Sequence, residues 1–245
     1  MSGIEKGVLC TKRGLTVILM IAAASFIAGM VLRPALARLR SQFLAPLAPT
    51  VEPNDSLHWA QKYAEFKGLK KTRNIVFLGD SRIEFGNWSE LFDRCDISNR
   101  GIGWDTTTGI LRRLPATIPS HVELCVIQAG INDLLQGCSP DFVDSKFSEI
   151  LHDIITRTKS KVVVTSVILL GRDRAALNVK IGACNQRLAT RCTELGAVFV
   201  DINSLLCPDG FLSGSYSHDG IHLNWEGYQQ IRSVLEKYLP PLVKQ

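Results

Sequence analysis

Two short segments of this sequence hold the residue types needed for acyl transfer by a serine. Gly79-Asp80-Ser81 follows an apolar run, and Asp219-Gly220-Ile221-His222 lies near the C-terminal end. A serine hydroxyl becomes a nucleophile when a base lies within hydrogen-bond reach and a third group fixes the tautomer of that base. A carboxylate three residues before an imidazole can complete such a set. Ser81, Asp219 and His222 are therefore the candidates for nucleophilic catalysis.

Each segment alone also has a purely structural interpretation. A serine after a strand is more often the N-cap of the next helix than a nucleophile. Asp219 could cap a turn beside a surface histidine. His218 and His222 have the spacing of a metal pair, but no further Cys, His or carboxylate cluster completes a site, so no metal is expected.

Two further segments could stabilise a developing oxyanion. Asn132, in Gly130-Ile131-Asn132-Asp133, carries a side-chain amide, and one such donor is typically worth about 3 kcal/mol of barrier. A turn or a helix cap is the alternative role for Asn132 and Asp133. The glycines of the segment Asn99–Asp105 would let the backbone approach a ligand closely. No Lys-Ser/Thr follows this segment, as a phosphate-binding P-loop would require.

The four segments read GDS, NRGIGWDT, GIND and DGIH, and they occur in the order and spacing of the conserved blocks of the SGNH (GDSL-type) hydrolases. From about Asn74 to Tyr238 the chain resembles this family. The resemblance implies that Ser81 is the nucleophile, His222 the general base and then acid, and Asp219 the group that orients His222. It further implies an oxyanion hole made of the Ser81 N–H, the Asn132 amide and a third N–H from the glycine block. It implies no cofactor.

One position departs from the family's pattern. Family members usually have glycine just before the Asp-Thr pair, and this chain has Trp104 there. A backbone N–H needs no particular side chain, so either Trp104 or Gly103 could supply the third donor. The indole of Trp104 could also fill part of the acyl pocket or restrict the loop.

The elements that must position these residues follow from an alternation of apolar runs and amphipathic stretches. The predicted strands are Ile75–Gly79, Asp96–Asn99, Leu124–Gly130, Lys161–Leu170 and Ala197–Asp201. The predicted helices are Leu57–Lys67, Glu84–Asp93, Thr106–Leu114, Pro140–Lys159, Ala175–Leu195 and Asn224–Tyr238. Continuously apolar runs rich in Val and Ile suit strands covered on both faces. The alternation predicts an α/β fold, a three-layer α/β/α flavodoxin-like domain with a mostly parallel five-stranded sheet. Its functional groups are expected beyond the C-terminal ends of the strands.

Residues 1–40 are predicted to be a membrane anchor that precedes this domain. Leu15–Leu32 is free of charge over 18 positions, and as a helix it would span roughly 27 Å, close to the hydrocarbon core of a bilayer. Basic residues flank both of its ends. An uncleaved signal-anchor is favoured, with the domain on the exterior, periplasmic or extracytoplasmic, side. A signal peptide cleaved at Ala35-Leu36-Ala37 is the alternative.

Residues 41–56 contain three prolines and suit an extended linker, which leaves 57–245 as the hydrolase domain. The formal net charge of +5 arises in the first 50 residues, and from Val51 onward acidic and basic side chains are equal in number. Nucleic-acid binding needs basic charge clustered on the domain itself, so no nucleic-acid partner is expected. Among the seven cysteines there is no CxxC pair, and Cys125, within an apolar run, is predicted to be an inert core residue.

The predicted function is hydrolysis of carboxylic esters through an acyl-Ser81 intermediate. The expected location points to an acetylated glycan or a lipid ester of the cell envelope as substrate. Two alternatives stay open. One is an acyl or acetyl transferase that uses the same triad to modify a polysaccharide. The other is a non-catalytic flavodoxin-like module that binds an anionic ligand near Arg82 and Arg100.

Overall fold

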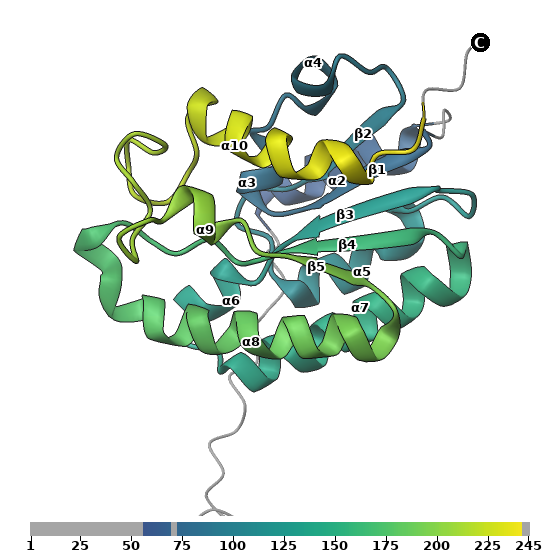
Figure 1. Ribbon diagram of the computed structural model, residues 1–245. Helices are drawn as coiled ribbons and strands as arrows, with labels where there is room; N and C mark the ends of the chain where they lie inside the picture. Colours follow the sequence, from purple (N-terminus) through teal and green to yellow (C-terminus); the bar gives the residue numbers. More distant parts are fainter. Residues whose placement is uncertain (1–55, 70–72, 242–245) are drawn as a thin grey trace, which may run out of the picture. The chain divides into compact units, whose positions relative to one another are not determined.

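A five-stranded parallel sheet forms the middle layer of the protein, and helices cover both of its faces (Figure 1). The computed structural model describes residues 56–69 and 73–241. The strands are β1 (Ile75–Gly79), β2 (Ile97–Gly101), β3 (Leu124–Gln128), β4 (Lys161–Thr165) and β5 (Val198–Val200). They are arranged in the order β2-β1-β3-β4-β5, and every pairing is parallel. The predicted three-layer α/β/α domain is therefore confirmed, with the strand order of flavodoxin-like folds.

Two helical layers and two hydrophobic cores sandwich the sheet. One layer consists of α5 (Thr107–Thr117), α6 (Ile131–Leu135), α7 (Pro140–Thr158) and α8 (Asn178–Leu195). The other consists of α3 (Ser81–Glu84), α4 (Trp88–Phe92), α9 (Asn203–Leu206) and α10 (Trp225–Leu235). Two short 3-10 turns, Arg172–Leu177 and Glu236–Tyr238, complete the described elements together with α2 (Leu57–Gly68), which packs near α5. Because both faces are covered, all residues of β1 and β3 are buried, as their apolar runs predict.

The predicted helix Glu84–Asp93 is wrong as a single element, since the chain forms α3 and α4 with a break around Gly86. The side-chain amide of Asn99 explains the break. It donates to the carbonyl oxygens of Ile83, Glu84 and Gly86, at 2.9, 3.0 and 3.0 Å. These carbonyls lie where α3 ends, and a side chain of β2 binds all three. The Ile83 carbonyl also accepts the Gly86 N–H at 3.2 Å and Trp88 Nε1 at 2.8 Å.

The predicted strand Lys161–Leu170 extends too far, because β4 ends at Thr165. Beyond it, three asparagine side chains take the place of a neighbouring strand. Their Oδ1 atoms accept backbone N–H groups at 2.8 to 2.9 Å, in the pairs Val167 with Asn185, Leu169 with Asn203, and Leu170 with Asn178. The apolar sequence continues because these residues stay buried in a loop whose backbone is satisfied by side chains.

The predicted membrane span Leu15–Leu32, its basic flanks and nearly all of the predicted linker lie outside the described residues. Among the helices of 56–69 and 73–241, none combines the length and apolar character needed to cross a membrane.

The six cysteines of the described domain are free thiols, and five of them are buried. Cys125 lies in β3 with no exposed surface, where burial raises the pKa of its thiol to about 12. A thiol that stays protonated is a poor nucleophile, so the prediction of an inert core cysteine is confirmed.

Candidate active site

Ser81 begins helix α3 just beyond the C-terminal end of the interior strand β1. The turn between them needs Gly79, because a Cβ at that position would lie 2.0 Å from the carbonyl oxygen of Gln128. The N-cap of α3 is Asp80, whose carboxylate accepts the N–H of Arg82 at 3.0 Å. Ser81 is therefore not the cap, and its hydroxyl is available for another partner. Its own N–H lies in the first helical turn, where backbone N–H groups have no intrahelical acceptor.

The structure brings Ser81, His222 and Asp219 together in one hydrogen-bonded chain. Ser81 Oγ lies 3.0 Å from His222 Nε2, although the residues are 141 positions apart. His222 Nδ1 lies 2.6 Å from Asp219 Oδ2. This arrangement leaves Nε2 as the atom that can take the serine proton, provided that the proton on the ring resides on Nδ1.

Asp219 orients its own turn as well as the imidazole. Its Oδ1 accepts the backbone N–H groups of Ile221 and His222, at 2.8 and 2.7 Å. Partial burial raises the pKa of Asp219, but the hydrogen bonds from the His222 imidazole and from these two N–H groups outweigh it. They hold the pKa of the carboxyl well below its usual range. Asp219 thus stays an anion beside His222, as stabilisation of an imidazolium requires.

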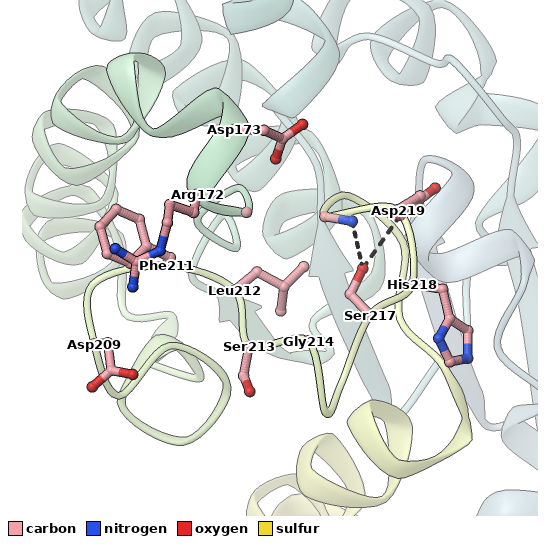
Figure 2. Close-up of a pocket in the computed structure, with 12 residues that line it drawn as sticks. Arg172, Asp173, Asp209, Phe211, Leu212, Ser213, Gly214, Ser217, His218 and Asp219 are labelled. Atoms are coloured by element: carbon pink, nitrogen blue, oxygen red, sulfur yellow. Dashed lines mark hydrogen bonds between the residues drawn. The ribbon is translucent and has the colours of Figure 1, made fainter.

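The turn that carries Asp219 is supported from outside the triad. Gly220 has a positive φ of 71°, a conformation that suits glycine, and its carbonyl accepts the N–H of Gly171 at 2.8 Å. Figure 2 shows the Ser217 hydroxyl pointing at this turn, where it accepts the Gly220 N–H at 3.0 Å and donates to Asp219 at 3.3 Å. These contacts fix the turn and thereby the position of the Asp219 carboxylate.

A polar cavity of about 420 Å³ adjoins the outer side of the same turn (Figure 2). Arg172 lies over the ring of Phe211 at one end, 4.6 Å from its centroid. The lining reaches Asp219 but does not include Ser81 or His222. The cavity therefore borders Asp219 but does not reach the Ser81 hydroxyl.

Asn132 lies in the first turn of α6, a helix that the sequence did not predict. Its Nδ2 donates to the backbone carbonyl of Asp105 at 2.8 Å, which leaves the second amide hydrogen for a ligand. The adjacent Asp133 accepts both the N–H and the hydroxyl of Thr107, the hydroxyl at 2.6 Å. Asn132 and Asp133 thus join the loop after β3 to the loop after β2, and neither is the N-cap of α6.

The structure separates the two candidates for the third donor. The N–H of Gly103 donates to Glu84 Oε2 at 2.6 Å. Trp104 has a φ of 64°, in the left-handed region that the family's glycine would adopt without strain. Within the described residues, the Trp104 N–H donates no hydrogen bond. The Trp104 indole is 68% exposed, so it does not fill an enclosed acyl pocket.

Arg82 and Arg100 do not offer cations to a ligand. Arg82 is buried, and its Nε and Nη1 donate to the carbonyls of Ile221 and Ile168 at 2.9 and 3.1 Å. Burial lowers the pKa of both guanidinium groups. Arg100 is also buried and lies over the ring of Phe66, 5.0 Å from its centroid. The flavodoxin-like binding alternative therefore lacks the two cations on which it rested.

Several residues around the triad were not identified from the sequence. Phe85 is 59% exposed, and its ring centroid lies 5.2 Å from that of the His222 imidazole. Glu84 and Phe85 come three and four positions after Ser81, but nothing in a single sequence distinguishes them from ordinary helical residues. Within the described part of the chain, no group of three or more His, Cys, Asp or Glu side chains is arranged to hold a metal ion.

The fold agrees with comparisons to known proteins. Residues 77–230, more than half of the chain, match the GDSL-like Lipase/Acylhydrolase family. The chain belongs to this family. Among solved structures it resembles in fold AlinE4, an SGNH-hydrolase family esterase, with a TM-score of 0.50 at 20% identity over 71% of this chain and 100% of that one.

Two curated relatives differ in how much of their length is matched. An N-acylneuraminate cytidylyltransferase from Streptococcus agalactiae is 26% identical over 191 residues, which are 77% of this chain and 43% of that protein. The chain therefore spans less than half the length of this relative. Platelet-activating factor acetylhydrolase IB subunit alpha2 from Rattus norvegicus is 27% identical over 182 residues, 71% of this chain and 80% of that protein.

Among solved structures, a Streptococcus pneumonia protein provisionally described as a platelet activating factor has a TM-score of 0.70. It is 22% identical, and the match covers 83% of this chain and 99% of that one. At this identity the likeness shows the fold alone.

Proposed function

We propose that this chain is a serine esterase that hydrolyses carboxylic esters through an acyl-Ser81 intermediate. The observation that carries the proposal is the hydrogen-bonded chain from Ser81 Oγ through the imidazole of His222 to Asp219, with distances of 3.0 and 2.6 Å. Membership of the GDSL-like lipase/acylhydrolase family supports ester hydrolysis in general, and one relative is named an acetylhydrolase.

In the first step, Ser81 Oγ attacks the carbonyl carbon of the ester while His222 Nε2 takes the hydroxyl proton. Asp219 stabilises the imidazolium that forms. The tetrahedral intermediate then expels the alcohol, which takes the proton back from His222. In the second step, His222 takes a proton from water, and the hydroxide attacks the acyl carbon. Ser81 leaves with the proton from His222, and a carboxylic acid is released.

The negative charge on the carbonyl oxygen is held by three donors. These are the N–H of Ser81, the free hydrogen of the Asn132 amide and the N–H of Trp104. Trp104 is assigned in preference to Gly103 because the Gly103 N–H is already bonded to Glu84 at 2.6 Å. Removal of one such donor typically costs about 10²- to 10³-fold in kcat.

For the substrate, we propose a lipid ester or an acetylated glycan of the cell envelope. Phe85 supports an apolar group next to the scissile bond, since its exposed ring lies beside His222 and would be covered by a bound substrate. The ratio of kcat/KM for octanoate and acetate esters measures this preference. An increase with chain length favours the lipid ester, and a preference for acetate favours the glycan.

For the location, we propose that residues 15–32 anchor the chain in a membrane, with the domain on the exterior side. This rests on the uncharged run and its basic flanks. Protease added to intact cells tests it, because an exterior domain is digested without lysis and a cytoplasmic one is protected.

Hydrolysis of p-nitrophenyl acetate by the purified full-length chain tests the chemistry. Ser81→Ala is expected to lower kcat at least about 10³-fold, since it removes the nucleophile. Ser120→Ala is the matched control, because Ser120 also contacts a histidine, His121, at 3.4 Å. Ser120 is exposed and precedes β3, at the edge of the sheet opposite to the one that Ser81 follows. Equal hydrolysis by wild type and Ser81→Ala would contradict the proposal.

A further inference from the structure

Helix α2 precedes the segment that matches the family, yet it contacts the backbone that would hold the oxyanion. Its Trp59 and Phe66 are 2% and 4% exposed, and they form a separate core with Ile102 of the glycine-containing loop. We propose that α2 is a positioning element of the active site, and that Trp59 is its principal positioning residue. This inference rests on the proposed esterase function.

The first contact runs through Asp105, which immediately follows Trp104. Trp59 Nε1 donates to Asp105 Oδ1 at 3.0 Å, and Arg113 Nε donates to Asp105 Oδ2 at 2.7 Å. All three side chains are buried. Oδ1 also accepts the backbone N–H of Thr106 at 3.1 Å. The two side-chain donors come from different helices, α2 and α5, and they fix the carboxylate in the plane that its donors define.

The fixed Asp105 places two of the three oxyanion donors. Its backbone carbonyl accepts Asn132 Nδ2 at 2.8 Å, so its position sets the direction of the remaining amide hydrogen. Its peptide neighbour is Trp104, whose N–H is the third donor. Trp104 has a left-handed φ of 64°, which a non-glycine residue keeps only when the surrounding structure holds it there. The Trp59 bond supplies part of that constraint.

The second contact runs through Glu84 on the other side of Trp104. His58 Nε2, also from α2, lies 2.9 Å from Glu84 Oε1, and Glu84 Oε2 accepts the Gly103 N–H at 2.6 Å. Glu84 thereby fixes the residue before Trp104, as Asp105 fixes the residue after it. Because His58 is half exposed, its share of the constraint is smaller than that of the buried Trp59.

This geometry assigns α2 a role in turnover and not only in stability. Donors held in advance at the position of the oxyanion stabilise the transition state without reorganisation, while the ground-state ester uses them less. A looser loop should therefore lower kcat and leave KM nearly unchanged.

Kinetics of the full-length Trp59→Phe variant test the inference. Phenylalanine keeps an aromatic ring in the small core and removes the Nε1–H donor together with part of the indole. We expect kcat to fall about tenfold or more, with KM within about twofold of wild type. Affinity for a trifluoromethyl ketone, which forms a tetrahedral adduct with the serine, should fall in parallel with kcat.

Phe66→Leu is the matched control, because Phe66 lies in the same helix and the same small core but donates no hydrogen bond. Its ring also lies 5.9 Å from the guanidinium carbon of Arg113, so we expect Phe66→Leu to lower the unfolding temperature and to lower kcat less than Trp59→Phe does. His58→Ala provides a second variant at an exposed position that folds in any case, with an expected two- to fivefold fall in kcat. If Trp59→Phe does not fold, the kcat of His58→Ala alone tests the role of α2.

Unchanged kcat and ketone affinity in the variants that fold would overturn the role of α2 while leaving the esterase proposal intact. Equal losses of kcat in Trp59→Phe and Phe66→Leu would also overturn it, since they would show a general effect of stability. A wild-type chain with no activity dependent on Ser81 would instead reject the esterase proposal itself.

Discussion

Arg82 donates a hydrogen bond from Nε to the backbone carbonyl of Ile221 at 2.9 Å. The first residue immediately follows the nucleophile candidate Ser81, and the second immediately precedes the base candidate His222. Nη1 of the same guanidinium donates to the backbone carbonyl of Ile168, in the loop after β4, at 3.1 Å. One buried side chain therefore joins the start of α3 to the turn that carries the imidazole, across 139 positions of sequence.

Arg82→Lys should lower kcat about tenfold or more, because an ammonium group cannot reproduce the planar fork that binds two carbonyls at once. Arg157→Lys is the matched control. Arg157 also donates to a backbone carbonyl, that of Ile118 at 2.6 Å, but it lies on α7 and not at the triad. Steady-state kinetics and thermal unfolding of both variants separate the effects. The proposed role of Arg82 is wrong if both variants keep wild-type kcat.

Asp219→Asn should lower kcat by about 10⁴-fold, since an amide no longer fixes the tautomer of His222 or stabilises the imidazolium. The low pKa of the Asp219 carboxyl also sets a pH window. A carboxyl whose pKa is depressed on folding contributes stability above its unfolded pKa, near 3.9, and loses it as pH falls through the folded value. The difference in unfolding free energy between wild type and variant should therefore shrink as pH falls below about pH 4. A difference that already declines between pH 8 and 5 would contradict the depressed pKa.

Trp104→Gly should keep kcat within about threefold for a small acetate ester, because the backbone N–H is retained and glycine accepts the left-handed φ without strain. Trp104→Val is the contrasting variant. A β-branched residue at a φ of 64° should be less stable than glycine by about 1 kcal/mol, after allowance for the greater entropy of glycine in the unfolded chain. Urea denaturation measures this order. A valine variant as stable as the glycine variant would show that the backbone at this position is unstrained.

Asp80→Asn should change how stability depends on pH. Complete burial raises the pKa of Asp80 to about 6, although the neighbouring Arg82 lowers it. The folded state therefore binds more protons than the unfolded state between about pH 4 and 6, and this carboxyl lowers stability as pH rises through that window, by up to about 3 kcal/mol. Asparagine keeps the N-cap contact to the Arg82 N–H and does not titrate.

Denaturation midpoints of wild type and Asp80→Asn at pH 4, 5, 6 and 7 measure this difference. The stability of Asp80→Asn relative to wild type should increase as pH rises from about 4 to 6. A gap that stays constant would show that the pKa of Asp80 is near its ordinary value, and a gap that moves the other way would show that folding lowers it; either result would contradict the raised pKa.

Much of the fold could be predicted because local sequence and long-range packing agree. The buried strands β1 and β3 read as continuous apolar runs. The N-cap of α7 is Ser139, whose side chain accepts the Phe142 N–H, and Pro140 is the first helical residue. Predictions were wrong where distant side chains set an element's end. The break between α3 and α4 depends on Asn99, and the end of β4 coincides with the asparagine contacts from α8 and α9.

For the candidate site, the residue types and spacing of four short segments were enough to predict Ser81, Asp219, His222 and Asn132 as site residues. Their support could not be predicted in the same way. Trp59 donates to a residue 46 positions away, and the buried Arg82 reads in sequence as a surface cation near a crevice. Periodicity cannot reveal which distant carbonyl or carboxylate a polar side chain will meet. The assignment of the third donor to Trp104 likewise needed the Gly103 contact with Glu84.

Covalent labelling tests the central claim, that Ser81 is an activated nucleophile, most directly. The full-length chain is incubated with a fluorophosphonate, and the adduct is located by intact-mass measurement and peptide mapping. We predict a single adduct on Ser81 that is absent from Ser81→Ala and forms far more slowly in Asp219→Asn. Failure of the wild-type chain to react, or an adduct on another serine that persists in Ser81→Ala, would contradict the proposed nucleophile.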